Sequence, residues 1–272
     1  MAGRMLPQWA AIAKPIIGML HLPPLPGSPR YGGKLDAIHD AVLRDAQALA
    51  EGGVHGLILE NFGDVPFYPA AVPPHVIAHM TALAAGIRAR FDLPLGINVL
   101  RNDGRAALAI AHAAGASFIR VNVLSGVRVA DQGIIQGIAH ELLRDRAILG
   151  ADVKIFADVD VKHSVPLSDR PLADEVSDTL HRGLADALIV SGWATGQKTD
   201  PRQVREVKAA AGSAPVFVGS GVTADNAREY APFCDGFIIG SAFKRNGRAS
   251  EPVDVDRVRA LVAGTLRVPS AS

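Results

Sequence analysis

The chain has few of the features that mark disulfide-bonded, nucleic-acid-binding or membrane-spanning proteins. It holds a single cysteine, Cys234, which excludes an internal disulfide and fits a reducing compartment. The net charge is only +1 at pH 7, so nucleic acid is not an expected partner. No stretch approaches the roughly 18 uninterrupted apolar residues of a membrane span, and no secretory leader pattern opens the chain. We therefore expect a cytoplasmic protein without an integral membrane segment, and peripheral association with a membrane stays open.

The sequence instead repeats one unit, a short run of Val, Ile and Leu followed by a polar turn and an Ala-rich helical segment. This alternation predicts parallel strands joined by crossover helices. Strands are expected at residues 15–20, 56–59, 95–99, 118–121, 154–159, 187–190, 216–218 and 237–239. The length of 272 residues is close to the roughly 250 of a (β/α)8 barrel. We predict an α/β fold of the (β/α)8 TIM-barrel type, with an open doubly wound sheet as the alternative.

Helical segments are expected between these strands, and several of them end in glycine, as helix C-caps commonly do. They fall at about residues 36–51, 74–90, 104–114, 134–149, 172–182, 201–211, 224–230 and 253–263. We expect residues 1–13 to form an N-terminal extension, either disordered or closing the bottom of the barrel. Residues 14–272 are expected to form a single barrel domain.

Two glycine-bearing turns close the last two predicted strands. They contribute Gly219, Ser220 and Gly221 after the first run, and Gly240 and Ser241 after the second. Glycine lets backbone N–H groups approach an anion, and the last two units of a (β/α)8 barrel often build a phosphate site in this way. We predict a phosphate-binding site at the C-terminal ends of strands 7 and 8. The alternative is a pair of ordinary tight turns.

Polar residues crowd the C-terminal ends of the other predicted strands, where barrel enzymes place their chemistry. For proton transfer or carbonyl activation we predict Glu60, Asp158, Asp160, Lys162 and His163. For substrate contacts we predict His21, Asn98, Arg120, Asn122 and Ser191. Such crowding is costly unless the groups are paired or take part in function.

Structural alternatives exist for several of these residues. Alternation along residues 156–161 predicts that Asp158 and Asp160 share one face, where an ion-pair network with Lys162 or Arg120 would also explain them. His21 could be a satisfied core histidine, although the prolines after it fix it at a strand exit. We expect Arg120 to face the barrel lumen, because an arginine on the apolar outer side would be expensive.

Two chemical roles at these positions stay open. A Schiff base on Lys162 requires desolvation to lower its pKa, but the neighbouring carboxylates would raise that pKa, so we expect an electrostatic role. A divalent metal could be held by Glu60, Asp158, Asp160 and His163, although no compact ligand motif supports it. No other cofactor is predicted.

Proline-rich loops follow the first two predicted strands, at residues 22–35 and 65–74. Their composition excludes helix and central strand. The loops carry four large apolar or aromatic residues, Leu25, Tyr31, Phe67 and Tyr68. If these were exposed they would form a patch of the kind that marks an interface, so we predict a homo-oligomer.

Several segments together resemble the BtpA family. They are KPIIGMLHLPPLPGSPRY (14–31), ENFGDVPF (60–67), GINVLRND (96–103), FIRVNVLSG (118–126), DQGII (131–135), DVDVKH (158–163) and VGSGVT (218–223). The resemblance implies a TIM-barrel, phosphate-binding type of fold, and it brings no established reaction or agreed catalytic residues. The family is named for a role in photosystem I biogenesis, and another member belongs to a sugar operon. Nothing in these residues indicates chlorophyll or an iron–sulfur cluster.

Two functions from different classes follow. The first is an enzyme that binds a small phosphorylated metabolite, such as a sugar phosphate or a phosphoribosyl compound, and performs acid–base chemistry of the isomerase, epimerase or lyase type. The second is a non-catalytic assembly or biogenesis factor that retains a ligand-binding barrel. A scaffold would need an exposed apolar patch and would have no use for polar residues at the strand ends.

Overall fold

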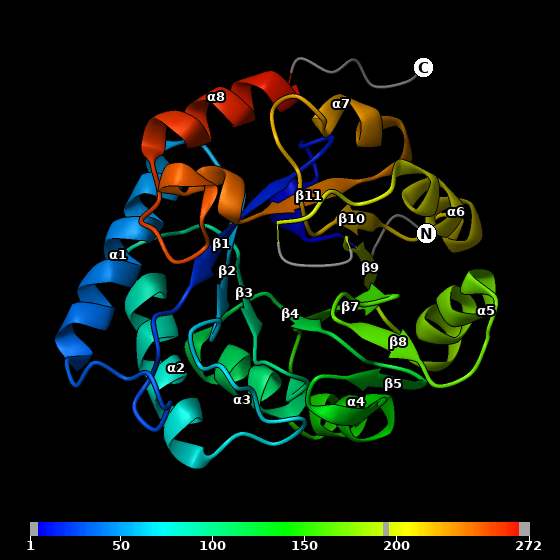
Figure 1. The fold of residues 1–272 in the computed structure, drawn as a ribbon, viewed down its shortest axis with the longest axis horizontal. Coiled ribbons are helices and arrows are strands. Elements are labelled where there is room, and N and C mark those ends of the chain that lie inside the picture. Colours follow the sequence, from blue (N-terminus) through cyan, green and yellow to red (C-terminus); the bar gives the residue numbers. More distant parts are fainter. Residues whose placement is uncertain (1–4, 193–195, 267–272) are drawn as a thin grey trace.

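The computed structural model describes residues 5–192 and 196–266, which form a closed barrel of eight parallel strands (Figure 1). Its strands are β1 (Ile16–His21), β2 (Gly56–Glu60), β3 (Leu95–Asn98), β4 (Phe118–Val121), β7 (Lys154–Val159), β9 (Ala187–Val190), β10 (Val216–Val218) and β11 (Gly236–Ile239). Pairing of β11 with β1 closes the barrel. The predicted (β/α)8 TIM barrel is therefore confirmed, and the open sheet is wrong.

Helices surround the barrel because each buries an apolar stripe against it, as α1 does with Ile38, Val42 and Leu49. The helices are α1 (Leu35–Glu51), α2 (Pro74–Arg88), α3 (Gly104–Ala114), α4 (Ala139–Ile148), α5 (Leu172–Ser177), α6 (Pro201–Ala211), α7 (Ala227–Tyr230) and α8 (Val255–Leu266). A π-helical turn, η2 (Asp178–Arg182), continues α5, and short 3-10 turns include η1 (Pro7–Trp9) and η4 (Ser241–Phe243). In the described part of the chain, no helix has both the length and the hydrophobicity needed to cross a bilayer.

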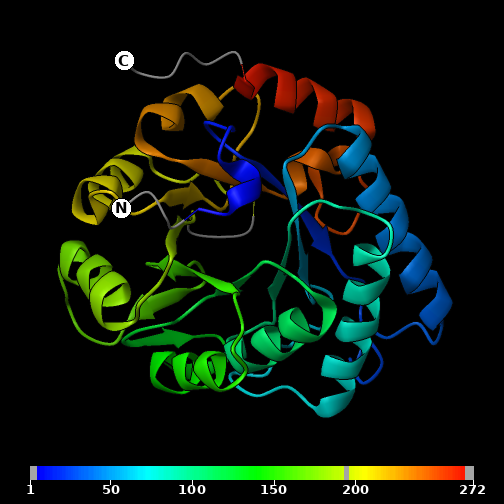
Figure 2. The same ribbon diagram turned by 180° about the vertical axis from the view of Figure 1, so that it is seen from behind.

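The N-terminal segment packs against the end of the barrel at which the strands begin, called the lower end here, and this end faces the viewer in Figure 2. The end at which the strands finish is called the upper end. The Trp9 ring lies 5.9 Å from the ring of Phe118, 6.4 Å from Phe156 and 6.2 Å from Phe217. Trp9 Nε1 also donates a hydrogen bond to the His55 carbonyl at 2.6 Å. Residues 1–4 of the expected N-terminal extension and residues 267–272 of the expected barrel domain lie outside the described residues. Within residues 5–13, Leu6 and Trp9 pack in the same apolar cluster as the lower barrel residues.

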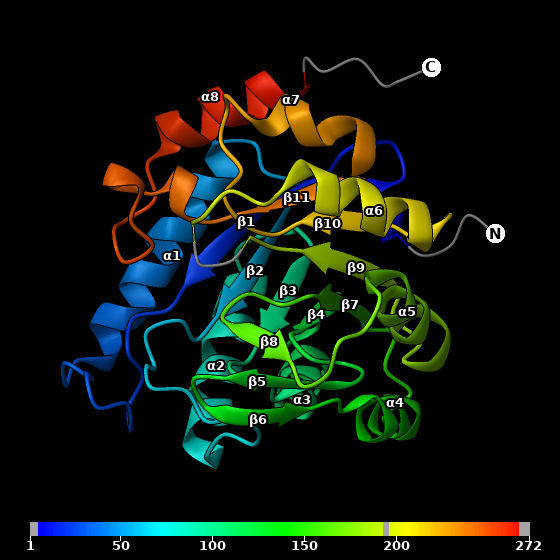
Figure 3. The ribbon, with the colours of Figure 1, turned by 45° about the vertical axis from the view of Figure 1, so that its right-hand side comes forward.

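A small antiparallel sheet, which the sequence analysis did not predict, lies beside the barrel (Figure 3). Its central strand β5 (Val127–Ala130) pairs with β6 (Gly133–Gln136) and with β8 (Ser164–Pro166). The helix expected from residue 134 is wrong at its start, because residues 133–136 pair with β5 and α4 begins only at Ala139. Two apolar residues in a row at Ile134 and Ile135 fit either structure, and only the pairing decides between them.

The proline-rich loops pack on the barrel more closely than expected. Leu25 is fully buried, and its backbone N–H donates to Asp64 Oδ1 at 2.8 Å. Tyr31 and Phe67 are half-buried, while Tyr68 is 51% exposed. The apolar surface that motivated a homo-oligomer is therefore smaller than the sequence suggested.

Candidate functional site

The residues that face the barrel interior change from aromatic to charged along single strands. In β4, Phe118 belongs to the lower layer and Arg120 follows it two residues later; in β7, Phe156 and Asp158 repeat the pattern. Because side chains alternate along a strand, both members of each pair point to the same side. The upper half of the lumen is therefore polar.

Asp158 is held on both carboxylate oxygens at the centre of this polar half. Arg120 donates from Nε to Oδ2 at 2.8 Å and from Nη2 to Oδ1 at 2.7 Å, and Asn122 Nδ2 donates to Oδ2 at 2.9 Å. Ser191 Oγ lies 3.5 Å from Oδ1. The side chains of Arg120 and Asp158 are 1% and 0% exposed, so the arginine does face the lumen. Asp158 has the geometry of a structural ion pair, which was the alternative to a catalytic base.

Asn98 supports the same network from β3. Its Nδ2 donates to the Arg120 carbonyl at 3.1 Å and to Asn122 Oδ1 at 3.3 Å. The predicted substrate-contact residues Asn98, Asn122 and Ser191 thus lie around the buried ion pair. Their contacts hold Arg120 and Asp158 in place.

Asp160 and His163 follow the C-terminal end of β7. Strand β7 ends one residue before Asp160, and the two residues have left-handed φ angles of 49° and 57°. The Asp160 carboxylate accepts hydrogen bonds from Arg128 Nη2 at 2.5 Å and from Gln203 Nε2 at 2.7 Å, beside the small sheet. The expectation that Asp158 and Asp160 share a face is wrong, because the strand alternation stops before it reaches Asp160.

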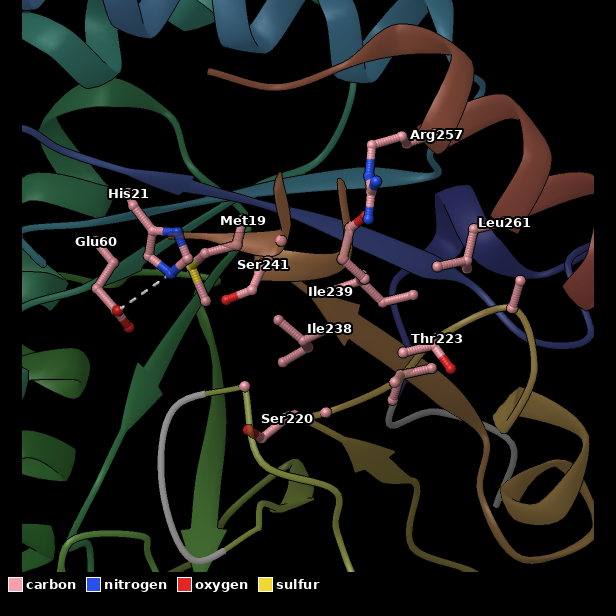
Figure 4. Close-up of a pocket in the computed structure, with 18 of the residues that line it drawn as sticks. Met19, His21, Glu60, Ser220, Thr223, Ile238, Ile239, Ser241, Arg257 and Leu261 are labelled. Atoms are coloured by element: carbon pink, nitrogen blue, oxygen red, sulfur yellow. Dashed lines mark hydrogen bonds and ion pairs between the residues drawn. The ribbon is translucent and has the colours of Figure 1, made fainter. Parts of the chain in front are cut away.

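A cavity of about 460 Å³ opens above the polar network, toward β10, β11 and α8 (Figure 4). It brings together most of the predicted site residues, namely His21, Glu60, Arg120, Lys162, Gly219, Ser220, Gly221, Gly240 and Ser241. The remaining predicted residues do not line it; they are Asn98, Asn122, Asp158, Asp160, His163 and Ser191. Both glycine turns and the upper end of the lumen therefore open into one space.

His21 and Glu60 face each other at one wall of the cavity. His21 Nε2 lies 3.9 Å from Glu60 Oε1, and the side chains are 7% and 5% exposed. Burial, reinforced by the charges of Lys244 and Lys162, lowers the pKa of His21 well below its usual value, so the imidazole is neutral near pH 7. Its Nδ1 finds no hydrogen-bond partner in the described part of the chain. A neutral imidazole beside a carboxylate is suited to proton transfer.

Lys162 contributes an amine to the same cavity. Burial and the Arg120 charge lower the pKa of Lys162 to about 8, against the opposing charges of Glu60 and Asp158. The neighbouring carboxylates raise this pKa as expected, but they do not prevent a net downward shift. The physical reason is that Arg120 already neutralises Asp158, so burial has the larger effect. An amine with this pKa is partly neutral near pH 8, which a nucleophile or a proton acceptor requires.

The backbone itself forms the wall of the cavity at the two turns. A Cβ atom at Gly240 would lie 2.7 Å from His21 Cε1, so a side chain there would displace the histidine. Gly221 has φ +65°, and a Cβ atom there would lie 2.1 Å from the Gln197 carbonyl oxygen. Both glycines are therefore required for the close approach of the chain at these turns. The Gly219 N–H already donates to the Val190 carbonyl at 2.8 Å, so the other residues of the turns would have to supply N–H groups to a ligand.

Arg257 on α8 also lines the cavity, although the sequence analysis gave it no role. Its Nε donates to the Ala242 carbonyl at 3.0 Å, and Figure 4 shows the guanidinium directed toward the cavity. The sequence offered no signal for this contact, since it depends on how α8 crosses the turn after β11.

The four residues considered as metal ligands do not assemble into a site. Asp158 is engaged by Arg120, and Asp160 lies beside the small sheet, away from Glu60. Among residues 5–192 and 196–266, no three His, Cys, Asp or Glu side chains come together in a way that could hold a metal ion.

The fold is shared with solved barrel enzymes of low sequence identity. Thiamine phosphate pyrophosphorylase from Pyrococcus furiosus aligns with a TM-score of 0.56 and 15% identity, covering 94% of this chain and 96% of that one. N-(5'-phosphoribosyl)anthranilate isomerase from the same organism aligns with a TM-score of 0.56 and 13% identity, covering 94% and 100%. These similarities concern the fold alone.

Sequence comparisons are more specific. A protein of Thermococcus kodakarensis is 51% identical over 249 residues, which cover 92% of this chain and 94% of that protein. The photosystem I biogenesis protein BtpA of Synechocystis sp. is 48% identical over 248 residues, which cover 91% and 86%. Residues 12–266 match the model of the BtpA family. The chain therefore belongs to the BtpA family.

Proposed function

We propose that this protein is an enzyme that binds the phosphate of a small phosphorylated metabolite, such as a sugar phosphate or a phosphoribosyl compound. The reaction is acid–base chemistry of the isomerase, epimerase or lyase type. The observation that carries this proposal is the single cavity lined both by the two glycine turns and by His21, Glu60 and Lys162. A phosphate fixed at the turns would hold the rest of the molecule against these titratable groups.

Phosphate binding is assigned to the turns at residues 219–221 and 240–241, with Arg257 as a cation that lines the same cavity. Backbone N–H groups at glycine turns bind anions without a side chain, and a guanidinium adds a charge-assisted hydrogen bond. The names of two structural neighbours refer to thiamine phosphate and to a phosphoribosyl compound, which agrees with this assignment.

Proton transfer is assigned to Glu60 and His21, and charge stabilisation to Lys162. Glu60 would accept a proton from a carbon next to a carbonyl group, and neutral His21 would carry a proton between substrate positions. The ammonium form of Lys162 would stabilise the negative charge that develops on the carbonyl oxygen. His21 ends β1 and Lys162 lies three residues after β7, and these two strands are on opposite sides of the barrel, so a substrate between the two side chains would contact both.

A purely structural role in assembly fits these observations less well. Buried titratable groups reduce stability, and a scaffold gains nothing from them. Family relatives also include a mitochondrial protein of Caenorhabditis elegans, a nematode without photosystems, at 34% identity. A chemistry common to these organisms explains the family better than a task confined to photosystem I.

A thermal-shift screen tests the proposal with sugar phosphates, phosphoribosyl compounds and their unphosphorylated counterparts. A ligand at about 100 times its Kd should stabilise the protein by roughly 2.7 kcal/mol. Ser241→Asp should remove this stabilisation, because a carboxylate in the turn repels phosphate. Ser213→Asp, at an exposed position before β10, is the matched control and should keep it. Equal stabilisation by unphosphorylated sugars, or stabilisation that survives Ser241→Asp, would contradict phosphate binding.

A further inference from the structure

Of the four cationic side chains that are fully buried in the described part of the chain, three pair with carboxylates. In the described part of the chain, the buried cationic side chains belong to Arg101, Arg120, Arg128 and Lys244. The last three pair with Asp158, Asp160 and Asp45 respectively. Arg101 has no carboxylate within 4 Å among the described residues, so no close ion pair with those residues neutralises its charge.

The surroundings of Arg101 leave part of its guanidinium unused. The residue is 3% exposed; its Nη2 donates to the Lys162 carbonyl, while Nε has no hydrogen-bond partner within the described chain. Burial lowers the pKa of Arg101, although the charges of Asp158, Asp131 and Glu60 oppose this effect. Arginine nevertheless stays charged in proteins. A buried charge without a counter-charge costs free energy, which a bound anion would recover.

Lys162 is a second cation without a close carboxylate among the described residues, and it is hydrogen-bonded to Arg101. Its backbone carbonyl accepts the Arg101 hydrogen bond, and its side chain lines the cavity. No carboxylate of the described residues lies within 4 Å of its ammonium group. The nearby carboxylate that also lines this part of the cavity, Glu60, faces His21. The strand before Lys162, β7, is three strands away from β11 in the barrel, so this positive charge enters the cavity from a side away from the Ser241 turn.

We propose that Lys162 and Arg101 neutralise a second anionic group of the substrate. The substrate is then a phosphorylated compound whose other end carries a carboxylate or a second phosphate. This inference rests on the proposed function, in which the glycine turns hold the first phosphate. Lys162 contacts the second anion directly. Arg101 is a positioning residue, which holds the Lys162 backbone and adds its own charge behind it.

Calorimetric titration with matched probes tests this second anion site. The six-carbon set is glucitol 6-phosphate, 6-phosphogluconate and glucitol 1,6-bisphosphate, and the three-carbon set is glycerol 3-phosphate, 3-phosphoglycerate and glycerol 1,3-bisphosphate. In at least one set, the acid or the bisphosphate should bind about tenfold more tightly than the alcohol phosphate. Comparison of the acid with the bisphosphate identifies the second group.

Arg101→Gln should abolish that preference and leave the affinity for the alcohol phosphate unchanged. Glutamine keeps an N–H donor for the Lys162 carbonyl but removes the charge. Arg105→Gln, at a half-exposed position on α3, is the control and should keep the preference. The melting temperature provides a second readout, since Arg101→Gln should leave it unchanged or raise it, whereas Arg128→Gln should lower it. A loss of melting temperature as large as that of Arg128→Gln would identify Arg101 as structural and contradict the proposal.

The titrations also separate failure of this inference from failure of the proposed function. Alcohol phosphates that bind as tightly as the acids and bisphosphates overturn the second anion site and leave the phosphate site intact. If no phosphorylated probe binds the parent protein, both proposals are contradicted.

Discussion

The two ends of the same barrel are built from different chemistry, although they share strands. At the lower end, Phe118 and Phe156 pack around Trp9, and burial of apolar area stabilises the fold. Two residues later on the same strands, Arg120 and Asp158 bury charges whose removal from water costs free energy. The comparison teaches that this barrel obtains stability at one end and holds its buried charged groups at the other, the end at which barrel enzymes place their active sites.

The largest effect should come from breaking the ion pair at the upper end. Asp158→Asn should lower the free energy of unfolding by about 3–5 kcal/mol, because Arg120 would remain buried without a counter-charge. Denaturant unfolding measures this loss. The double variant Arg120→Met with Asp158→Leu should be more stable than Asp158→Asn. If Asp158→Asn instead unfolds like the parent and loses only turnover, Asp158 is a catalytic base.

The next largest effect should come from the lower end. Trp9→Ala should lower the free energy of unfolding by about 4 kcal/mol, because it leaves a cavity among three phenylalanine rings. Ligand affinity per folded molecule should stay unchanged, since Trp9 lies at the end opposite the cavity. A loss of ligand affinity without a loss of stability would contradict the claim that the lower end serves stability and the upper end serves binding.

The pH dependence of the free energy of unfolding should reflect the lowered pKa of Lys162. In the folded protein it releases its proton near pH 8, whereas the unfolded chain keeps it to about pH 10.5. The unfolded state therefore binds more protons between these values, and the free energy of unfolding should rise with pH, by at most about 3 kcal/mol. Lys162→Met should remove this rise, and Lys198→Met, at an exposed position, should keep it. An unchanged pH profile in Lys162→Met would show that the amine is not desolvated.

The smallest effect on stability should come from Arg257. Because its side chain is exposed, Arg257→Ala should change the free energy of unfolding by less than about 0.5 kcal/mol. Phosphate-ester affinity should fall about tenfold, since one charge-assisted contact is lost. Arg259→Ala, another exposed α8 residue outside the cavity, is the control for titration. Equal affinities in both variants would remove Arg257 from the phosphate site.

The barrel and the glycine turns could be predicted from the sequence because each depends on residues that are adjacent in the chain. Each strand is a short apolar run, and the turns at residues 219–221 and 240–241 follow two such runs directly. The small sheet could not be predicted, because β5 pairs with β8 as well as with β6. In the pairing with β8, partners such as Arg128 and Pro166 are 38 residues apart in the chain.

The electrostatics of the site were harder to predict than its composition. Strand β7 ends at Val159, as expected, but the strand alternation does not continue beyond it. Asp160 has a left-handed φ of 49°, and its carboxylate accepts a hydrogen bond from Arg128. The direction of the Lys162 pKa shift depended on which nearby carboxylate was already paired, and that pairing follows from the packed barrel. Arg257 lines the cavity because of the way α8 packs against the barrel, and no local sequence pattern predicts that packing.

The central claim is that one cavity joins a phosphate site to reactive groups across the barrel. A crystal structure of the protein soaked with the phosphorylated sugar that stabilises it most tests this claim directly. We expect the phosphate within hydrogen-bond distance of backbone N–H groups in the turns at residues 219–221 and 240–241, and the sugar end against Glu60 and Lys162. A phosphate bound outside this cavity, or a sugar directed away from both side chains, would contradict the account.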